Sequence, residues 1–157
     1  MKGVIFPVGQ NWEDAYIVVD VVKNATKLVV IGEALYYYRV RSGSITQSTH
    51  WSKHMWDGIY TYYHIYNQIT REYPALISIA KARLCWVHRV SIAMAATTEE
   101  WKEHIAEIKI KKRYIRGNLR ETMKNPYVSL FGKIDTIIAV VFPARIYGLL
   151  RRTLRYN

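Results

Sequence analysis

Two short blocks in the first third of the chain carry residue types that can do chemistry. The first is an acidic pair, Glu13 and Asp14, at the start of an expected helix. The second block ends in Arg39, Arg41 and Ser44. Carboxylates can transfer protons, and guanidinium groups bind anions through paired hydrogen bonds. This combination predicts a site that moves a negatively charged leaving group.

The two blocks resemble the distal end of the catalytic domain of family 2 glycosyltransferases, the GT-A enzymes that transfer a sugar from a nucleotide donor. The resemblance is carried, in the order and spacing of bacterial members, by Phe6-Pro7-x-Gly9, Glu13-Asp14 and Leu35-Tyr36-Tyr37-Tyr38-Arg39-x-Arg41-x-x-Ser44-Ile45. It covers residues 3–48 only. The nucleotide-binding half that usually precedes these blocks, with its Asp-x-Asp metal motif, is absent here. The sequence is therefore similar to a C-terminal piece of such an enzyme.

The resemblance implies a role for each of these residues in an inverting transfer. Asp14 is the expected general base, and Glu13 holds the acceptor or tunes the base. Arg39 and Arg41 are expected to bind the departing diphosphate, with Ser44 donating to a phosphate oxygen. The resemblance also implies a nucleotide-sugar donor and a carbohydrate or lipid-linked glycan acceptor. It further implies Mg²⁺ or Mn²⁺ in the full-length parent, bound through the missing motif, and neither metal binding nor activity in this chain alone.

Simpler explanations exist for both blocks. Glu13 and Asp14 can be an ordinary acidic first turn, favourable to the helix dipole by about 0.3 to 1 kcal/mol. Arg39 and Arg41, which alternate to the same side of a strand, can protect a solvated edge strand with their charge. The sequence leaves these alternatives open.

The first region is expected to be the end of a GT-A domain, over residues 1–48. Residues 12–25 are predicted to form a helix, and residues 28–31 and 35–40 two short strands separated by a glycine turn. The inward side of the helix is predicted to carry Ile17, Val18, Val21 and Val22. An unpaired sheet edge here would favour self-association or pairing with the missing half.

The second region, residues 49–157, is predicted to be a helical extension, which makes the fold class α+β and mostly α. Apolar spacing predicts a helix over 51–72, and a nearly uniform apolar helix over 75–96 is expected at the centre. Thr97-x-x-Glu100 has the pattern of a capping box for a third helix. Its buried stripe is predicted to be Trp101, Ile105, Ile108, Ile115 and Leu119. A final amphipathic stretch after Asn125-Pro126 is expected to bend or break at Pro143.

Positive charge is concentrated at the C-terminal end. Residues 1–108 carry 11 Lys and Arg against 10 Asp and Glu, whereas residues 109–157 carry 12 against 2. This asymmetry predicts a polyanionic neighbour, either an anionic membrane surface or nucleic acid. The residues expected to face it are Lys109, Lys111, Lys112, Arg113, Arg116, Arg145, Arg151, Arg152 and Arg155.

An anionic membrane is the favoured partner, because no groove-reading motif accompanies the charge and nucleic acid is correspondingly disfavoured. Residues 134–150 are too interrupted by charge to span a bilayer, but their pattern suits a helix lying in the headgroup plane. The alternative is a helix docked on the bundle with a solvated basic rim.

The remaining candidates carry less information. Cys85 lies in an apolar run, so we expect a buried, inert thiol and a reducing compartment. No signal peptide pattern opens the chain, which favours the cytoplasm or the inner face of the membrane. His50 and His54, with Asp57, are too few ligands for a zinc site. The other histidines, His64, His88 and His104, are expected to be packing or surface residues.

Overall fold

A computed structural model describes residues 3–37, 39 and 53–155, apart from the side chains of residues 53, 154 and 155. Within them the chain is mostly helical and contains no strand, so the predicted mostly α class is confirmed. The elements are α1 (Glu13–Tyr16), α2 (Val18–Lys23), α3 (Lys53–Glu72), a 3-10 turn (Pro74–Leu76), α4 (Ile77–Thr97), α5 (Ile105–Gly117), α6 (Leu119–Lys124), α7 (Leu130–Val141) and α8 (Ala144–Arg155).

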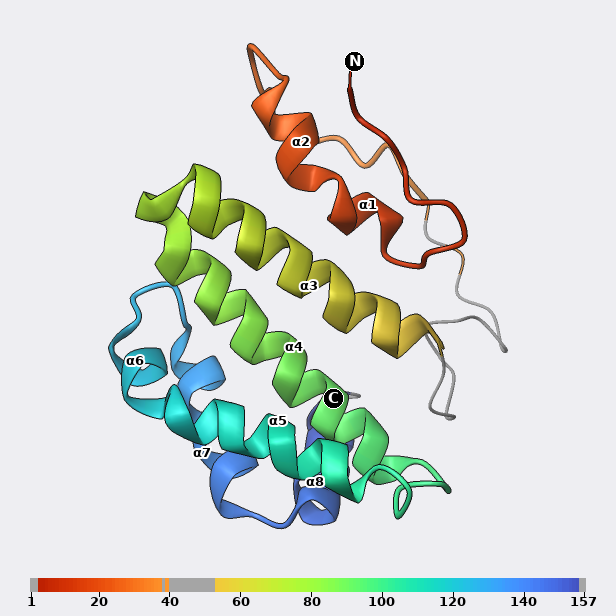
Figure 1. Ribbon diagram of the computed structural model, residues 1–157, viewed down its shortest axis with the longest axis vertical. Coiled ribbons are helices and arrows are strands. Elements are labelled where there is room, and N and C mark those ends of the chain that lie inside the picture. Colours follow the sequence, from red (N-terminus) through yellow and green to blue (C-terminus); the bar gives the residue numbers. More distant parts are fainter. Residues whose placement is uncertain (1–2, 38, 40–52, 156–157) are drawn as a thin grey trace.

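Helices α3 and α4 form a hairpin whose bounds agree with the predicted ones (Figure 1). Pro74 opens the 3-10 turn between them, where its fixed φ and missing N–H cost nothing. Ile59 of α3 packs against Leu84 and Val87 of α4, as the apolar spacing of α3 predicts. The two long helices are the scaffold on which the other elements lie.

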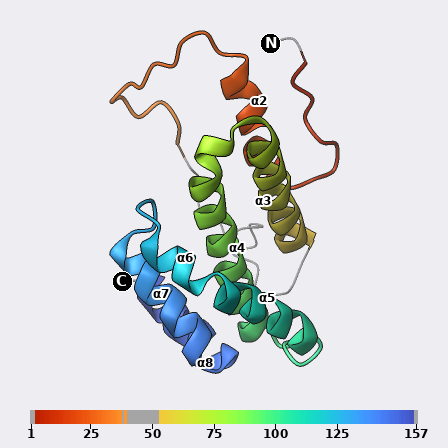
Figure 2. The ribbon, with the colours of Figure 1, turned by 60° about the vertical axis from the view of Figure 1, so that its left-hand side comes forward.

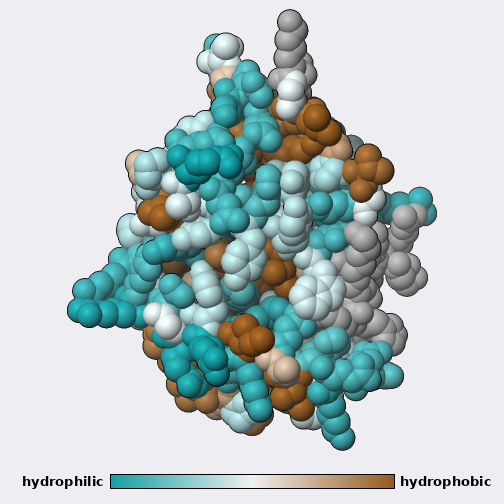
Figure 3. Space-filling model, in the orientation of Figure 1, coloured by the Kyte–Doolittle hydropathy of each residue, from teal (hydrophilic) through white to brown (hydrophobic). Residues whose placement is uncertain are grey.

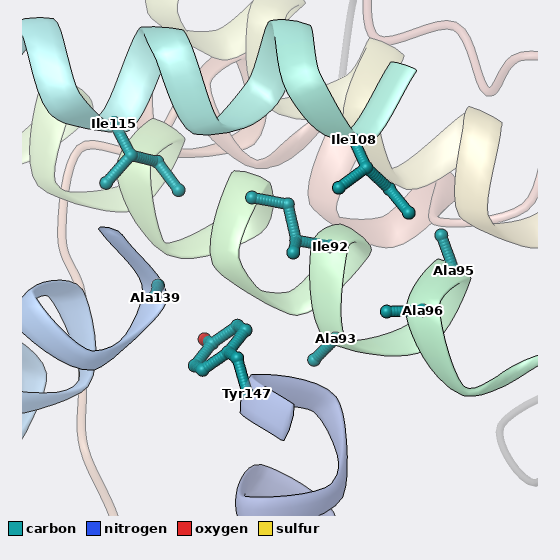
Figure 4. Close-up of a cluster of buried hydrophobic side chains, with 8 residues drawn as sticks. All are labelled: Ile92, Ala93, Ala95, Ala96, Ile108, Ile115, Ala139 and Tyr147. Carbon is teal, nitrogen blue, oxygen red and sulfur yellow. The ribbon is translucent and has the colours of Figure 1, made fainter. Parts of the chain in front are cut away.

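Helix α4 is central, as its uniform apolar composition predicts. One side packs against α3, and other sides pack against α5 and α8. The main core cluster gathers side chains of α4, α5, α7 and α8 around Ile92, which is fully buried (Figure 4). Small residues such as Ala93 let α8 approach closely: a Cβ added at Gly148 would lie 2.9 Å from the Ala93 carbonyl oxygen.

The predicted capping box at Thr97 is wrong. Thr97 is the last residue of α4, and its hydroxyl donates to the carbonyl oxygens of Ala93 and Met94 at 3.0 and 3.1 Å. A threonine hydroxyl that bonds back into its own helix is not free to cap the next one. Helix α5 begins at Ile105, which is partly exposed, although Ile108 is buried as predicted.

Helices α7 and α8 confirm the predicted break at Pro143, since α7 ends at Val141 and α8 begins at Ala144. The hydroxyl of Ser129 caps α7 by accepting from the Gly132 N–H at 3.1 Å. Figure 2 shows α7 and α8 against the side of the bundle that lies away from α1 and α2.

The two predicted strands are not present in the described residues. Residues 28–31 and 35–37 have no regular secondary structure, and their side chains are exposed, with Val30 at 97 %. Strand propensity reflects how well a side chain fits a pleated, half-buried surface. No described segment pairs with these residues, so their apolar side chains find no such surface. The GT-A sheet is therefore not shown.

The predicted helix over residues 12–25 is divided into α1 and α2 at Ile17. Ile17 is buried, as predicted, but Val18 and Val22 are about half exposed. The reason is that polar and aromatic contacts with α3, described below, orient these two short helices more than a hydrophobic stripe does.

Candidate functional site

The acidic pair lies in the first turn of α1, with both carboxylates exposed. Asp14 accepts a hydrogen bond from the Ala15 N–H at 2.7 Å. Burial raises the pKa of Tyr62 on α3, with Arg83 opposing that rise and the charge of Asp14 adding to it. Within the described residues neither carboxylate forms an ion pair, so both are accessible to a ligand.

A polar clasp fixes the start of α1 on α3. The backbone N–H and the side-chain amide of Asn11 both donate to one oxygen of Asp57 at 2.8 Å. Next to it, the amide of Gln10 donates to the hydroxyl of Thr61 at 3.0 Å. These bonds hold the residues immediately before the acidic pair.

Trp12 completes this clasp in an unusual conformation. Its φ is 64°, in the left-handed region that costs a non-glycine residue of order 1 kcal/mol or more. The indole N–H donates to the His54 carbonyl oxygen at 3.0 Å, and the ring stacks on the His54 imidazole. A Cβ at Gly58 would lie 3.0 Å from the Trp12 ring, so glycine leaves room for it. The strained backbone is held by these contacts.

Further contacts continue the clasp along α3 to the end of α2. Tyr16 stacks on His64 with the ring centroids 3.9 Å apart. Gln68 donates to Asp20 at 2.7 Å, and two residues near the helix ends, Lys23 and Glu72, form an ion pair at the same distance. Along these contacts the residue numbers rise together on both sides, so α1 and α2 run parallel to α3 (Figure 1).

Only Arg39 of the arginine block lies in the described residues, and it is not joined to the acidic pair there. Arg39 is exposed, and no hydrogen bond or ion pair in the described part of the chain joins it to Glu13 or Asp14. Arg41 and Ser44 lie outside the described residues. After α2 the chain runs out as a long excursion away from the bundle (Figure 2). The predicted diphosphate-binding roles therefore stay predictions.

Two of the predicted anion-binding residues form ion pairs within the bundle, so their charges are already matched there. Lys111 is buried, pairs with Glu107 and lies over the Trp56 ring. Arg151 reaches back into the bundle and pairs with Asp135 at 3.0 Å. The charge count of residues 109–157 placed both in the basic set, but Lys111 has an acidic partner one turn away and Arg151 has one on α7.

The other basic residues of the predicted set differ in exposure. Lys112 is half-buried, donates to the Phe142 carbonyl oxygen at 2.6 Å, and has its pKa lowered by burial. Arg145 is exposed and lies over the Trp101 ring at 4.9 Å. The side chain of Arg155 lies outside the described part. The predicted residues that are exposed without an ion pair in the described residues are Lys109, Arg113, Arg116, Arg145 and Arg152.

Sequence reasoning missed a buried charge network in the helical region. Arg89 of α4 is only 4 % exposed and donates to Asp135 at 2.8 Å and to the hydroxyl of Thr136 at 2.7 Å. Tyr147 donates to the second oxygen of Asp135 at 3.1 Å, and Arg151 donates to both Asp135 and Tyr147. Asp135 is the only acidic residue after Glu121 and lies in an apolar run, a pattern that favours a buried partner.

Three histidines of the described chain, His54, His64 and His88, pack against aromatic rings, as expected for His64 and His88. His54 and His64 stack on Trp12 and Tyr16, and burial lowers the pKa of both. Burial, reinforced by the charge of Lys111, lowers the pKa of His88 to about 4.

Metal-ligating side chains and the thiol of Cys85 give no second candidate site in the described residues. The described residues contain no group of three metal-ligating side chains, and His50 lies outside them. Cys85 is buried, as predicted, and burial raises the pKa of its thiol, so it is a poor nucleophile. The acidic pair is thus the best candidate site.

No family model, curated protein or solved structure matches the chain significantly. Among the described helices, none combines the length and apolar character needed to cross a membrane.

Proposed function

We propose that the chain is the C-terminal part of an inverting glycosyltransferase of family 2 type. In the full-length parent it acts with a nucleotide-binding half that carries the Asp-x-Asp motif. The observation that carries the proposal is the presentation of Glu13 and Asp14. Both carboxylates are exposed on a turn whose preceding residues, Asn11 and Trp12, are fixed on α3.

A fixed, exposed carboxylate is what the chemistry requires of a general base. In an inverting transfer the acceptor hydroxyl attacks the anomeric carbon from the face opposite the nucleotide. A base must therefore lie within about 3 Å of that hydroxyl to accept its proton. Asp14 takes this role in the proposal, and Glu13 orients the acceptor, which is a carbohydrate or a lipid-linked glycan.

Charge on the departing diphosphate is stabilised by other groups. The Asp-x-Asp of the parent would hold Mg²⁺ or Mn²⁺, which neutralises part of that charge. Arg39 and Arg41 supply guanidinium donors, and Ser44 supplies a hydroxyl. Because these residues follow a long excursion after α2, the nucleotide-binding half is needed to bring them to the donor.

The exposed apolar residues before the arginine block support the same proposal. Residues 28–31 are Leu, Val, Val and Ile, all more than half exposed. Such a run has high strand propensity and would bury its side chains if it paired with a neighbouring sheet. The missing half of a GT-A domain supplies such a sheet. A buried free Cys85 suits the reducing cytoplasm, where nucleotide-sugar donors are available.

The test is the turnover of the rejoined protein, in which this chain is expressed with its nucleotide-binding half. Asp14→Asn keeps the shape of the side chain and removes the base, so kcat should fall by about 10² to 10⁴. Glu33→Gln, an exposed carboxylate outside the acidic pair, is the matched control and should leave turnover unchanged. If Asp14→Asn behaves like the control, Asp14 is not the base.

A further inference from the structure

Helices α7 and α8 expose large apolar side chains that nothing in the described chain covers. Helix α7 exposes residues spaced by three and four, so they share one face. Figure 3 shows hydrophobic side chains along the lower edge of the molecule, where Figure 1 draws α7 and α8. The exposed apolar residues are Leu130, Phe131, Ile134, Ile137, Val141, Phe142, Ile146, Leu149 and Leu150.

From Thr122 onward, the exposed charges of the described side chains have one sign. Asp135 is the only acidic residue from Thr122 to the end of the sequence. It is buried, and its charge is matched by Arg89 and Arg151. The network therefore removes the one negative charge from the α7–α8 surface. Among the described side chains of this part, the charged ones left exposed are Lys124, Arg145 and Arg152.

We propose that α7 and α8 lie on the surface of an anionic lipid bilayer, with their apolar side chains among the acyl chains and their basic residues at the headgroups. Each helix has 12 residues and is about 18 Å long, well short of the roughly 30 Å of a hydrocarbon core. Helices with an apolar face and a Lys- and Arg-rich rim bind in the interfacial plane. This inference goes beyond the transferase proposal and does not depend on it.

Other occupants fit this surface less well. A second copy of the chain would bring the same basic residues face to face, and like charges in an interface are unfavourable. Nucleic acid is bound by basic and polar groups, whereas the centre of this surface is aliphatic. A bilayer with anionic headgroups matches both the apolar face and the positive rim.

The test is co-sedimentation of the full chain with vesicles of phosphatidylglycerol and phosphatidylcholine, and with vesicles of phosphatidylcholine alone. The chain should bind the anionic vesicles more strongly, and binding should weaken between about 50 and 500 mM salt, where charge is screened. The variant Val141→Glu/Leu149→Glu places carboxylates on the face and should reduce binding at least about tenfold.

A matched control separates the face from general hydrophobicity. Leu76→Glu makes the same kind of change at an exposed leucine in the turn between α3 and α4, outside α7 and α8. It should bind as the wild type does. Circular dichroism establishes that each variant is folded, which is expected because all three positions are exposed.

Several results would overturn the proposal. Equal binding to neutral and anionic vesicles without salt dependence would remove the role of the basic rim. Unchanged binding by Val141→Glu/Leu149→Glu would show that another surface is used. A wild-type dimer in solution that this variant converts to monomer would assign the face to a second copy. Loss of vesicle binding on adding duplex DNA would assign the surface to nucleic acid.

Discussion

Residues 3–37 and helices α4 to α8 differ in how far their side chains are buried. The helical part buries a core around Ile92 and even neutralises a buried Asp135. The N-terminal part carries the candidate chemistry, yet leaves side chains such as Val30 and Tyr37 almost fully exposed. Residues 10–12 and the two short helices are held on α3 by the clasp, whereas the side chains of residues 28–31 and 35–37 are exposed. Stability and candidate chemistry therefore lie in different parts of the molecule.

The largest loss of stability is expected from a substitution of Asp135, in the buried network of the helical part. Asp135→Asn removes the negative charge that matches buried Arg89, and breaking a buried pair on one side typically costs about 3 to 5 kcal/mol. Urea denaturation measures this loss. The matched control is Glu99→Gln, since Glu99 is exposed and forms no ion pair in the described chain. A loss no larger than that of the control would mean that the network does not stabilise the helical part.

A second test is the pH dependence of stability at His88. Burial holds its pKa at about 4, below the ordinary value of 6.5, so the folded state keeps the ring neutral while the unfolded state gains a proton. The contribution of this pKa shift to the free energy of unfolding is fully present above pH 6.5 and is lost as the pH falls toward about 4. It amounts to about 3 kcal/mol.

His88→Gln removes this titration and keeps a group that can hydrogen-bond to Tyr63. The stability difference between wild type and variant, measured by denaturation across this pH range, should therefore shrink as the pH falls. A difference that is the same at pH 7 and pH 4 would contradict the assignment of a buried neutral imidazole.

A third test concerns the close approach of α8 to α4. In Gly148→Ala the new Cβ would lie 2.8 Å from a methyl carbon of Thr97 and 2.9 Å from the Ala93 carbonyl oxygen. Overpacking of this kind should cost about 1 to 3 kcal/mol. Gly117→Ala has nothing within 4 Å and should be neutral or stabilising. Thermal unfolding compares the two, and equal melting temperatures would argue against tight packing of α8.

The smallest global effect is expected at the clasp. Asp57→Ala removes the acceptor of both Asn11 hydrogen bonds. Because the clasp lies at the edge of the fold, global stability should change by less than about 1 kcal/mol, whereas α1 and α2 should open more readily. Hydrogen exchange should then accelerate over residues 13–23 and stay unchanged in α4. Acceleration spread equally over α4 would show that the two parts unfold together.

Helix bounds in the helical part were predicted best where a long apolar stretch ends near a proline. Helix α3 follows an apolar period and α4 a nearly uniform apolar run, on either side of Pro74, and Pro143 separates α7 from α8. The capping box at Thr97 failed because the same hydroxyl can bond back into the preceding helix, a choice that local sequence does not decide.

The sequence predicted the two carboxylates of the candidate site but not the contacts that hold them on α3. The clasp joins Asn11 to Asp57, 46 residues away, and Arg89 is equally distant from Asp135. No periodicity connects residues so far apart in the chain. The strands failed for a related reason, because a strand over residues 28–31 requires a partner that the described residues do not supply.

The measurement that tests the central claim most directly is the coding sequence upstream of Met1 in the source DNA, read in all three frames. The proposal predicts a strand-rich nucleotide-binding half that contains an Asp-x-Asp motif and continues into Gly3 and the residues after it. If no frame encodes such a half, the transferase proposal is contradicted, and the basic helical region would remain as the functional part.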